Sequence, residues 1–203
     1  EIFFIKKFKE TLENLQEKKG EYMIYYENIN NKNVKSRVEH FVPYFSNINY
    51  LLKTNIEPLL DNILGDKITL FKDKLNWKYP QGDGFKAHQD HPAWNDFPIT
   101  RFYSVALFAD DATKSNGCLE IVKEKNNNGL YNTNGCINET VEKTLNWEYL
   151  EATSADLLIF DSFIPHRSAK NTTDKSRSIF YFTYNKLSEG DYYNDYVKNK
   201  RKY

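Results

Sequence analysis

Cysteine, methionine and long apolar runs are scarce in this sequence. Only two of the 203 residues are cysteines, Cys118 and Cys136, and they show neither a CxxC motif nor a zinc-ligand spacing. A chain of this length can bury a core without disulfides or structural zinc, and we expect two reduced thiols in a cytoplasmic protein. No apolar run approaches the roughly 20 residues that a membrane span requires, so we expect no membrane partner.

The sequence also lacks an excess of charge of either sign. It contains 28 Lys and Arg against 28 Asp and Glu, which gives a formal net charge of zero. Nucleic-acid-binding domains usually carry a basic excess or stripe, so we expect no nucleic-acid partner. Aromatic residues make up 16% of the chain while methionine occurs once, which indicates a core built from Phe and Tyr.

Helical patterns come first along the chain, and strand patterns follow. Apolar residues at helical spacing predict a helix over 6–19. A second helix is expected from Ser46, as its N-cap, to Gly65, with an interruption at Pro58. Short apolar or alternating segments predict strands at 22–26, 67–79, 101–109, 118–122, 157–160 and 178–184. Residues rich in Pro, Asn and Gly predict loops at 92–98 and 123–138, and a helical tail is expected at 189–203.

This order of elements predicts a mainly β fold in α+β order. We expect a jelly-roll, cupin-like barrel flanked by N-terminal helices, with a small ligand or metal at the barrel mouth. The chain, 1–203, is expected to form a single domain. It divides into a helical flank (1–66), the barrel (67–186) and a tail (187–203).

The segment 67–79 alternates with a period of two, as a strand does. One face is mostly apolar or aromatic, with Asp73 as the exception. The opposite face carries four polar residues, Lys72, Lys74, Asn76 and Lys78.

The first candidate site is the pair His88 and Asp90, with His166 far downstream. Residues two apart on a strand project from the same face, so His88 and Asp90 can point at one ion. Two His and one carboxylate on one side of a metal form the facial arrangement of non-haem Fe(II) oxygenases. The competing interpretations are a chance His-x-Asp sequence and a capping or hydrogen-bonding role for His166 beside Pro165.

Arg177 is the second candidate, because its side chain suits a dicarboxylate co-substrate. 2-Oxoglutarate binds iron through its C1 carboxylate and C2 carbonyl, which leaves the C5 carboxylate for the protein. A guanidinium fork matches a carboxylate with two parallel hydrogen bonds. Ser168, two residues after His166, would point the same way and add a hydroxyl. The competing interpretation is a solvent-facing arginine at the start of a strand.

Together these motifs resemble the phytanoyl-CoA dioxygenase superfamily over roughly residues 70–201. The segments that carry the resemblance occur in family order at 84–90, 109–113, 116–119, 156–160, 166–168 and Arg177. The resemblance implies a double-stranded β-helix, with Fe(II) on His88, Asp90 and His166. It also implies that Arg177 and Ser168 hold 2-oxoglutarate and that O2 is the second co-substrate.

The resemblance extends to two further residues and breaks at one segment. Lys78 matches a family lysine that helps to bind the co-substrate; a solvated lysine is the alternative. Trp94 matches an aromatic residue that lines the substrate pocket of ectoine hydroxylase; a loop tryptophan packed on the barrel is the alternative. The family's Pro-Gly-Ser-His segment is replaced at 123–126, which puts the loop shape and the substrate choice in doubt.

Segments 88–94, 161–168 and 184–191 look closest to family members that hydroxylate 2-aminoethylphosphonate. The expected activity is hydroxylation of an unactivated C–H bond in a small polar or zwitterionic molecule, with the protein orienting the substrate and excluding water. Two rival functions are another metal-dependent cupin-type enzyme and a catalytically silent ligand-binding relative. The sequence offers four cationic candidates for binding a phosphonate and does not rank them: Lys72, Lys74, Lys86 and Arg101.

Overall fold

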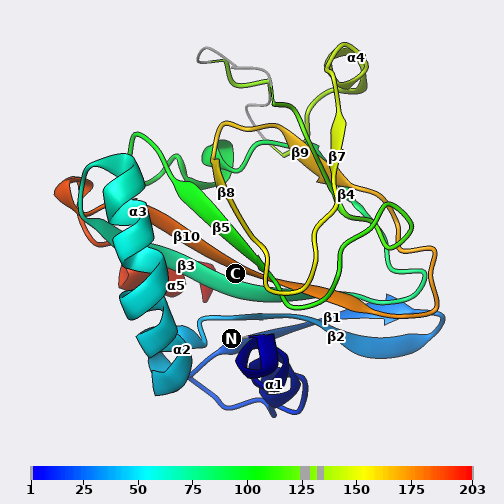
Figure 1. The fold of residues 1–203 in the computed structure, drawn as a ribbon, viewed down its shortest axis with the longest axis horizontal. Helices are drawn as coiled ribbons and strands as arrows, with labels where there is room; N and C mark the ends of the chain where they lie inside the picture. The colour runs from blue at the N-terminus through cyan, green and yellow to red at the C-terminus, as the bar shows by residue number, and fades with distance from the viewer. Residues whose placement is uncertain (1, 124–128, 132–134, 203) are drawn as a thin grey trace.

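Two antiparallel β-sheets form the body of the protein (Figure 1). The computed structural model describes residues 2–123, 129–131 and 135–202, so the expected loop at 123–138 lies partly outside the described residues. The larger sheet has the order β1 (Met23–Ile29), β2 (Lys32–Glu39), β3 (Ile68–Lys78), β10 (Arg177–Lys186), β5 (Tyr103–Phe108) and β8 (Leu157–Asp161). The smaller sheet has the order β4 (Phe85–His88), β9 (His166–Ser168), β6 (Leu119–Ile121) and β7 (Glu148–Leu150). This arrangement confirms the expected mainly β jelly roll.

The N-terminal helices cover one face of the larger sheet. They are α1 (Ile2–Glu13), α2 (Ser46–Leu51) and α3 (Glu57–Leu64), the last two joined by a π-helical turn at Leu52–Ile56. Phe8 of α1 packs on Phe180 of β10 and on Phe41, with ring centroids about 6 Å apart. The main apolar core therefore lies between these helices and the sheet, and it leaves the opposite sheet face free to form a site.

The first helix is displaced from its predicted position. It covers Ile2–Glu13 rather than 6–19, although Phe8 and Leu12 are fully buried as the pattern requires. Leu15 packs against the same core from beyond the helix end. The apolar spacing thus identified the buried face, whereas the helix ends were wrong because polar residues on either side carry no equivalent constraint.

The second helical region differs from the prediction at its start. Ser46 is the first helical residue and not the cap; the cap position is Phe45, which makes no side-chain bond. At Pro58 an α-helical segment restarts, because this residue lies in the first turn of α3, where its missing N–H is tolerated. Gly65 ends α3 with a φ of 65°, as expected.

Strand β3 presents both predicted faces, and both are buried. Leu75 and Trp77 point into the main core beneath the helices. Asp73, the exception on that face, is fully enclosed and accepts hydrogen bonds from the Phe41 N–H at 2.9 Å and from the Tyr193 hydroxyl at 2.5 Å. Burial raises the pKa of Asp73 to about 6 even with these partners. The polar face of β3 points to the space between the sheets.

Several short elements were not predicted. Strand β2 pairs with β1 and with β3, so residues 1–66 contribute a β-hairpin to the sheet as well as helices. Strands β7 and β9 are three residues long, too short to show a period. The remaining helical segments are 3₁₀ turns at Val42–Tyr44, His91–Trp94 and Leu187–Glu189, a short α4 (Glu139–Glu142), and α5 (Tyr193–Lys200) in the expected tail.

Neither cysteine is paired: Cys118 is buried and Cys136 is exposed, as expected of free thiols. None of the helices in the described ranges has the length and apolar character that a bilayer crossing requires.

Candidate active site

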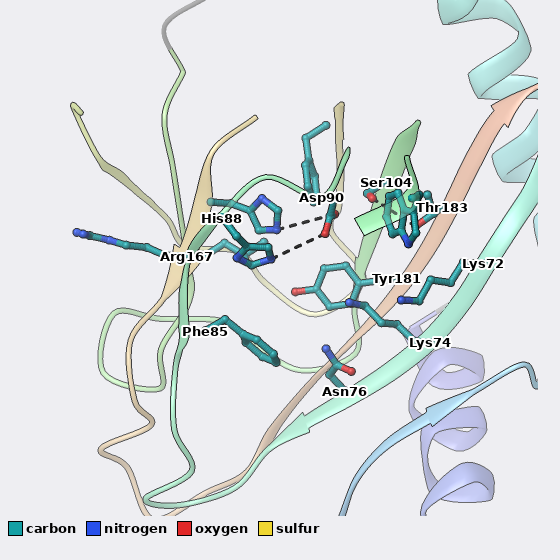
Figure 2. A pocket seen from close by; sticks show the side chains of 14 residues that line it. Lys72, Lys74, Asn76, Phe85, His88, Asp90, Ser104, Arg167, Tyr181 and Thr183 are labelled. Atoms are coloured by element: carbon teal, nitrogen blue, oxygen red, sulfur yellow. Dashed lines mark hydrogen bonds and ion pairs between the residues drawn. The ribbon is translucent and has the colours of Figure 1, made fainter. Parts of the chain in front are cut away.

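His88, Asp90 and His166 meet between the two sheets (Figure 2). One ligand atom from each lies within 4.8 Å of the others. His88 Nε2 is 3.8 Å from one oxygen of Asp90, and His166 Nε2 is 3.9 Å from the other. The two histidines are register partners on the neighbouring strands β4 and β9. The expectation that Asp90 lies on the strand is wrong: β4 ends at His88, and Asp90 precedes the 3₁₀ turn His91–Trp94.

Backbone carbonyls orient both imidazole rings. The Lys86 carbonyl lies 2.7 Å from His88 Nδ1, and the Ile164 carbonyl lies 3.0 Å from His166 Nδ1. A proton on each Nδ1 satisfies these carbonyls and leaves each Nε2 as a lone pair aimed at Asp90. This is the arrangement by which outer partners fix metal-bound histidines.

The protonation states also fit a divalent cation. Burial, together with the adjacent His166, lowers the pKa of His88 to about 4, so the ring is neutral at pH 7. Burial alone would raise the pKa of Asp90, but His166 and Lys74 outweigh it and hold that pKa below its usual value. Imidazole nitrogens and an ionised carboxylate oxygen are donors that suit Fe(II).

Gln89, between the two ligands, faces away from the site and ties down the ligand loop. Its amide donates to the Phe163 carbonyl at 2.7 Å, and its oxygen accepts from the Tyr131 N–H at 2.6 Å. No sequence pattern indicated this role of Gln89 beyond its position between the two ligands. The side chain is buried, and it holds the backbone between His88 and Asp90 in place.

Lys78, Ser168 and Arg177 come together at one end of the same space. Lys78 and Arg177 are register partners on β3 and β10. The Lys78 ammonium donates to Ser168 Oγ at 2.8 Å, and Arg177 donates from Nη2 to the Gly117 carbonyl at 2.5 Å. Arg177 is 4% exposed, which excludes the solvent-facing alternative. Arg177 lies on β10 of the larger sheet, whereas His166 lies on β9 of the smaller sheet. The expected hairpin between the two residues therefore does not form.

The electrostatics of this end favour an incoming anion. Burial and the charge of Arg177 lower the pKa of Lys78 to about 7. Within the described chain, Arg177 Nε is buried without a hydrogen-bond partner. A carboxylate placed here would accept from Arg177 and restore the positive form of Lys78.

The hollow at the metal ligands and the hollow at Arg177 adjoin each other. Three residues line both the hollow at the metal ligands and the hollow at Arg177: Asn76, Phe85 and Tyr181. A bidentate ligand on a metal could therefore extend past Phe85 and Tyr181 to reach Arg177. Asn76 and Tyr181 were not singled out from the sequence, although both lie on alternating strands beside predicted site residues.

Trp94 packs on the barrel and also lines the candidate pocket. It packs edge-on against Phe71 and Phe102, with ring centroids 5.5 and 4.9 Å away. It also lines the hollow that contains the metal ligands, close to Lys72. Trp94 therefore connects the barrel core to the pocket wall.

The structure ranks the four cationic candidates. Lys72 and Lys74 point from β3 into the pocket beside the metal ligands (Figure 2). Arg101 is bound to Asp161 at 2.5 Å and covers the ring of Phe163. Lys86 is exposed and does not line this pocket.

Gly117 supports the Arg177 end, and we predict that Gly117→Ala is strongly destabilising. Its φ of 73° disfavours any side chain, and an added Cβ would collide with the Ala169 carbonyl and the Lys78 ammonium. The matched control is Gly65→Ala, which has a φ of 65° and no atom within 4 Å of the added Cβ. In urea unfolding, the free energy of unfolding should fall by about 1 kcal/mol in Gly65→Ala and by at least about twice that amount in Gly117→Ala. Equal losses would contradict the steric explanation.

Comparison with known proteins agrees with this geometry. Residues 7–179 match the Phytanoyl-CoA dioxygenase (PhyH) family. A 2-aminoethylphosphonate dioxygenase from uncultured bacterium HF130_AEPn_1 is 34% identical over 97% of this chain and 77% of its own length. A methylphosphonate hydroxylase from Gimesia maris is 37% identical over 82% of this chain, an alignment that spans 65% of that relative.

Among solved structures, EctD from S. alaskensis with 2-oxoglutarate and 5-hydroxyectoine superposes with a TM-score of 0.77 at 18% identity. The superposition covers 93% of this chain and 68% of that one, and it shows a shared fold. With a family match over most of its length and two relatives above 30% identity, the chain belongs to the phytanoyl-CoA dioxygenase family of Fe(II)- and 2-oxoglutarate-dependent oxygenases.

Proposed function

We propose that this protein hydroxylates an unactivated C–H bond of a small phosphonate, with 2-aminoethylphosphonate as the first candidate. The observation that carries this proposal is the His-Asp-His cluster beside the buried Arg177, in two adjoining hollows that share Asn76, Phe85 and Tyr181 as lining residues. The names of the two relatives, both of which act on phosphonates, supply the substrate class.

The proposed roles follow the contacts. His88, Asp90 and His166 hold Fe(II) through two imidazole nitrogens and a carboxylate oxygen. Arg177 and Lys78, with Ser168, bind the C5 carboxylate of 2-oxoglutarate. When bound, iron, O2 and the co-substrate supply the oxidising chemistry, and 2-oxoglutarate ends as succinate and CO2.

The other pocket residues orient the substrate and exclude water. Trp94, Leu119 and Phe160 form apolar parts of the wall, with 5 to 7% of each residue exposed. Water exclusion protects the oxidising species and strengthens every charge interaction inside the pocket. We propose Trp94 as the substrate-pocket aromatic on this basis.

We also infer that residues 1–203 act as one catalytic domain in the cytoplasm, with a small molecule as the partner. The larger sheet with its helices and the smaller sheet share one site, which supports a single domain. The free cysteines support a reducing compartment. The net charge of zero supports the absence of a nucleic-acid partner.

Succinate release tests the proposed function. The Fe(II)-loaded protein, 2-oxoglutarate and O2 should form succinate faster with 2-aminoethylphosphonate or methylphosphonate than without a substrate, and 31P NMR should show a hydroxylated product. Metal binding without any response to 2-oxoglutarate would favour another cupin-type enzyme. Binding of neither iron nor 2-oxoglutarate would favour a catalytically silent relative.

A further inference from the structure

The inner face of the larger sheet carries a ladder of polar side chains. Strands β3 and β10 are paired so that Lys78 lies opposite Arg177, Lys74 opposite Tyr181, and Lys72 opposite Thr183. The ladder begins at the proposed co-substrate end, and its Lys72, Lys74 and Tyr181 line the pocket that contains the metal ligands (Figure 2). It therefore has a second cationic end, formed by Lys72 and Lys74.

Lys72 is held in place by its surroundings. Its ammonium lies 5.6 Å from the ring centroid of Trp94 and 5.3 Å from that of Tyr196, distances typical of cation–π contacts. Glu39 is 3.8 Å away, but this buried carboxylate also accepts from Arg37 at 3.1 Å. Lys72 therefore shares the negative charge of Glu39 with Arg37.

Lys74 has a less complete environment. Its ammonium lies 4.8 Å from the ring of Tyr181, and it forms no hydrogen bond or ion pair with any residue in the part of the chain that the structure describes. Burial and the charge of Lys72 lower its pKa to about 7. A half-buried ammonium that makes no direct ion pair is incompletely compensated, so a bound anion would stabilise it.

The carboxylates around this end are already engaged. Arg37, Lys72 and Lys74 interact with Glu39 and Asp90, and the third carboxylate, Asp73, accepts from the Phe41 N–H and the Tyr193 hydroxyl. Asp90 is also one of the proposed iron ligands. Lys74 therefore has no carboxylate dedicated to it alone.

The co-substrate cannot supply such a carboxylate at this end. Its far carboxylate is assigned to Lys78 and Arg177, and strand geometry places Lys74 about 13 Å and Lys72 about 20 Å from Lys78 along β3. The two cationic ends lie on either side of the metal ligands, and each is suited to a different anion.

We infer that Lys72 and Lys74 form the substrate's anion-binding subsite and take the phosphonate group. The buried hydroxyls of Ser104 and Thr183, 3.4 Å from each other, line the same end and can contribute to a tetrahedral oxyanion. Anchoring the phosphonate here directs the attached carbon toward the metal ligands. This inference rests on the proposed function, because it names how that substrate is held.

Lys74→Met is the sharpest test, because it removes the charge, keeps the length and breaks no ion pair within the described residues. Methylphosphonate binding is measured by calorimetry on the protein loaded with Fe(II) and 2-oxoglutarate under argon. The dissociation constant should rise at least tenfold in Lys74→Met and also rise in Lys72→Gln. Lys86→Met is the matched control, since Lys86 is an exposed lysine outside this pocket, and it should change the constant less than twofold.

Two further readouts separate a binding effect from a folding defect and from an unselective anion site. The Fe(II)–2-oxoglutarate visible band should be unchanged in Lys74→Met, which shows that the metal and co-substrate ends are intact. Inorganic phosphate should bind the unmodified protein at least tenfold more weakly than methylphosphonate, because it lacks the alkyl group that meets the apolar wall. Equal affinity for phosphate would overturn the assignment to the substrate's phosphonate.

The subsite and the proposed function can fail separately. Turnover of a phosphonate with unchanged affinity in Lys74→Met and Lys72→Gln would overturn the subsite and leave the function standing. Phosphonate binding that depends on Lys74, without succinate release, would support the subsite and overturn the function.

Discussion

Asp90→Ala should abolish the visible charge-transfer band that Fe(II) and 2-oxoglutarate give under anaerobic conditions, and His88→Ala should do the same. Each change removes one of three donors whose ligand atoms lie within 4.8 Å of one another. Loss of even an outer partner of a metal ligand costs roughly 10–100-fold in affinity, so loss of a ligand itself should weaken iron binding by at least that factor. Anaerobic titration with Fe(II), followed at the band and by calorimetry, measures the effect, and succinate release should fall to background.

His91→Ala is the matched control, because His91 directly follows Asp90 and yet lies outside the cluster. Its ring stacks on Phe163 at 4.2 Å, and its Nδ1 lies 3.3 Å from Ser162 Oγ. The variant should keep the band and lose only a modest amount of stability. A band that persists in Asp90→Ala, or disappears in His91→Ala, would contradict the assigned ligands.

The residues that carry the chemistry could be found from the sequence, because their types are rare and chemically specific. The chain has only four histidines, and two of them meet at the site. The residues around them could not be assigned in the same way. Alternation separated the two faces over residues 72–78 but not before them, because the register shifts at Phe71, which packs with Trp94 and not with Leu75. A period of two also does not say which face meets solvent, and here neither face does. From the sequence alone, Lys72 and Lys74 on the polar face of β3 could be either solvated or functional. The position of the second sheet is what places them in a pocket.

Short elements escaped prediction for a related physical reason. Strand β9 has three residues, and its pairing with β4 brings His166 beside His88. Such a strand is stabilised by its neighbours and not by its own composition. The same applies to Asp90, which leaves the strand because Gln89 fixes the backbone through the Phe163 carbonyl and the Tyr131 N–H.

Arg177→Lys should weaken 2-oxoglutarate binding by roughly 10–100-fold, the equivalent of about 1.4–2.7 kcal/mol, because a lysine keeps the charge and loses the two-pronged hydrogen bond. Arg177 is 4% exposed, and its Nε has no partner within the described residues, which is consistent with a donor waiting for a carboxylate. The dissociation constant is obtained by titrating the Fe(II) protein with 2-oxoglutarate and following the visible band.

Arg167→Lys is the control, since that guanidinium is engaged elsewhere, with Glu120 at 2.7 Å and Glu142 at 2.6 Å. It should alter stability and leave the 2-oxoglutarate constant within about twofold. The two cationic ends should also separate in a crossed experiment. Arg177→Lys should weaken 2-oxoglutarate and spare methylphosphonate, whereas Lys74→Met should do the reverse. The contrary result would be an unchanged 2-oxoglutarate dissociation constant in Arg177→Lys and a raised one in Lys74→Met. The two anions would then have been assigned to the wrong ends of the ladder, because only one end can hold the far carboxylate while the other holds the substrate.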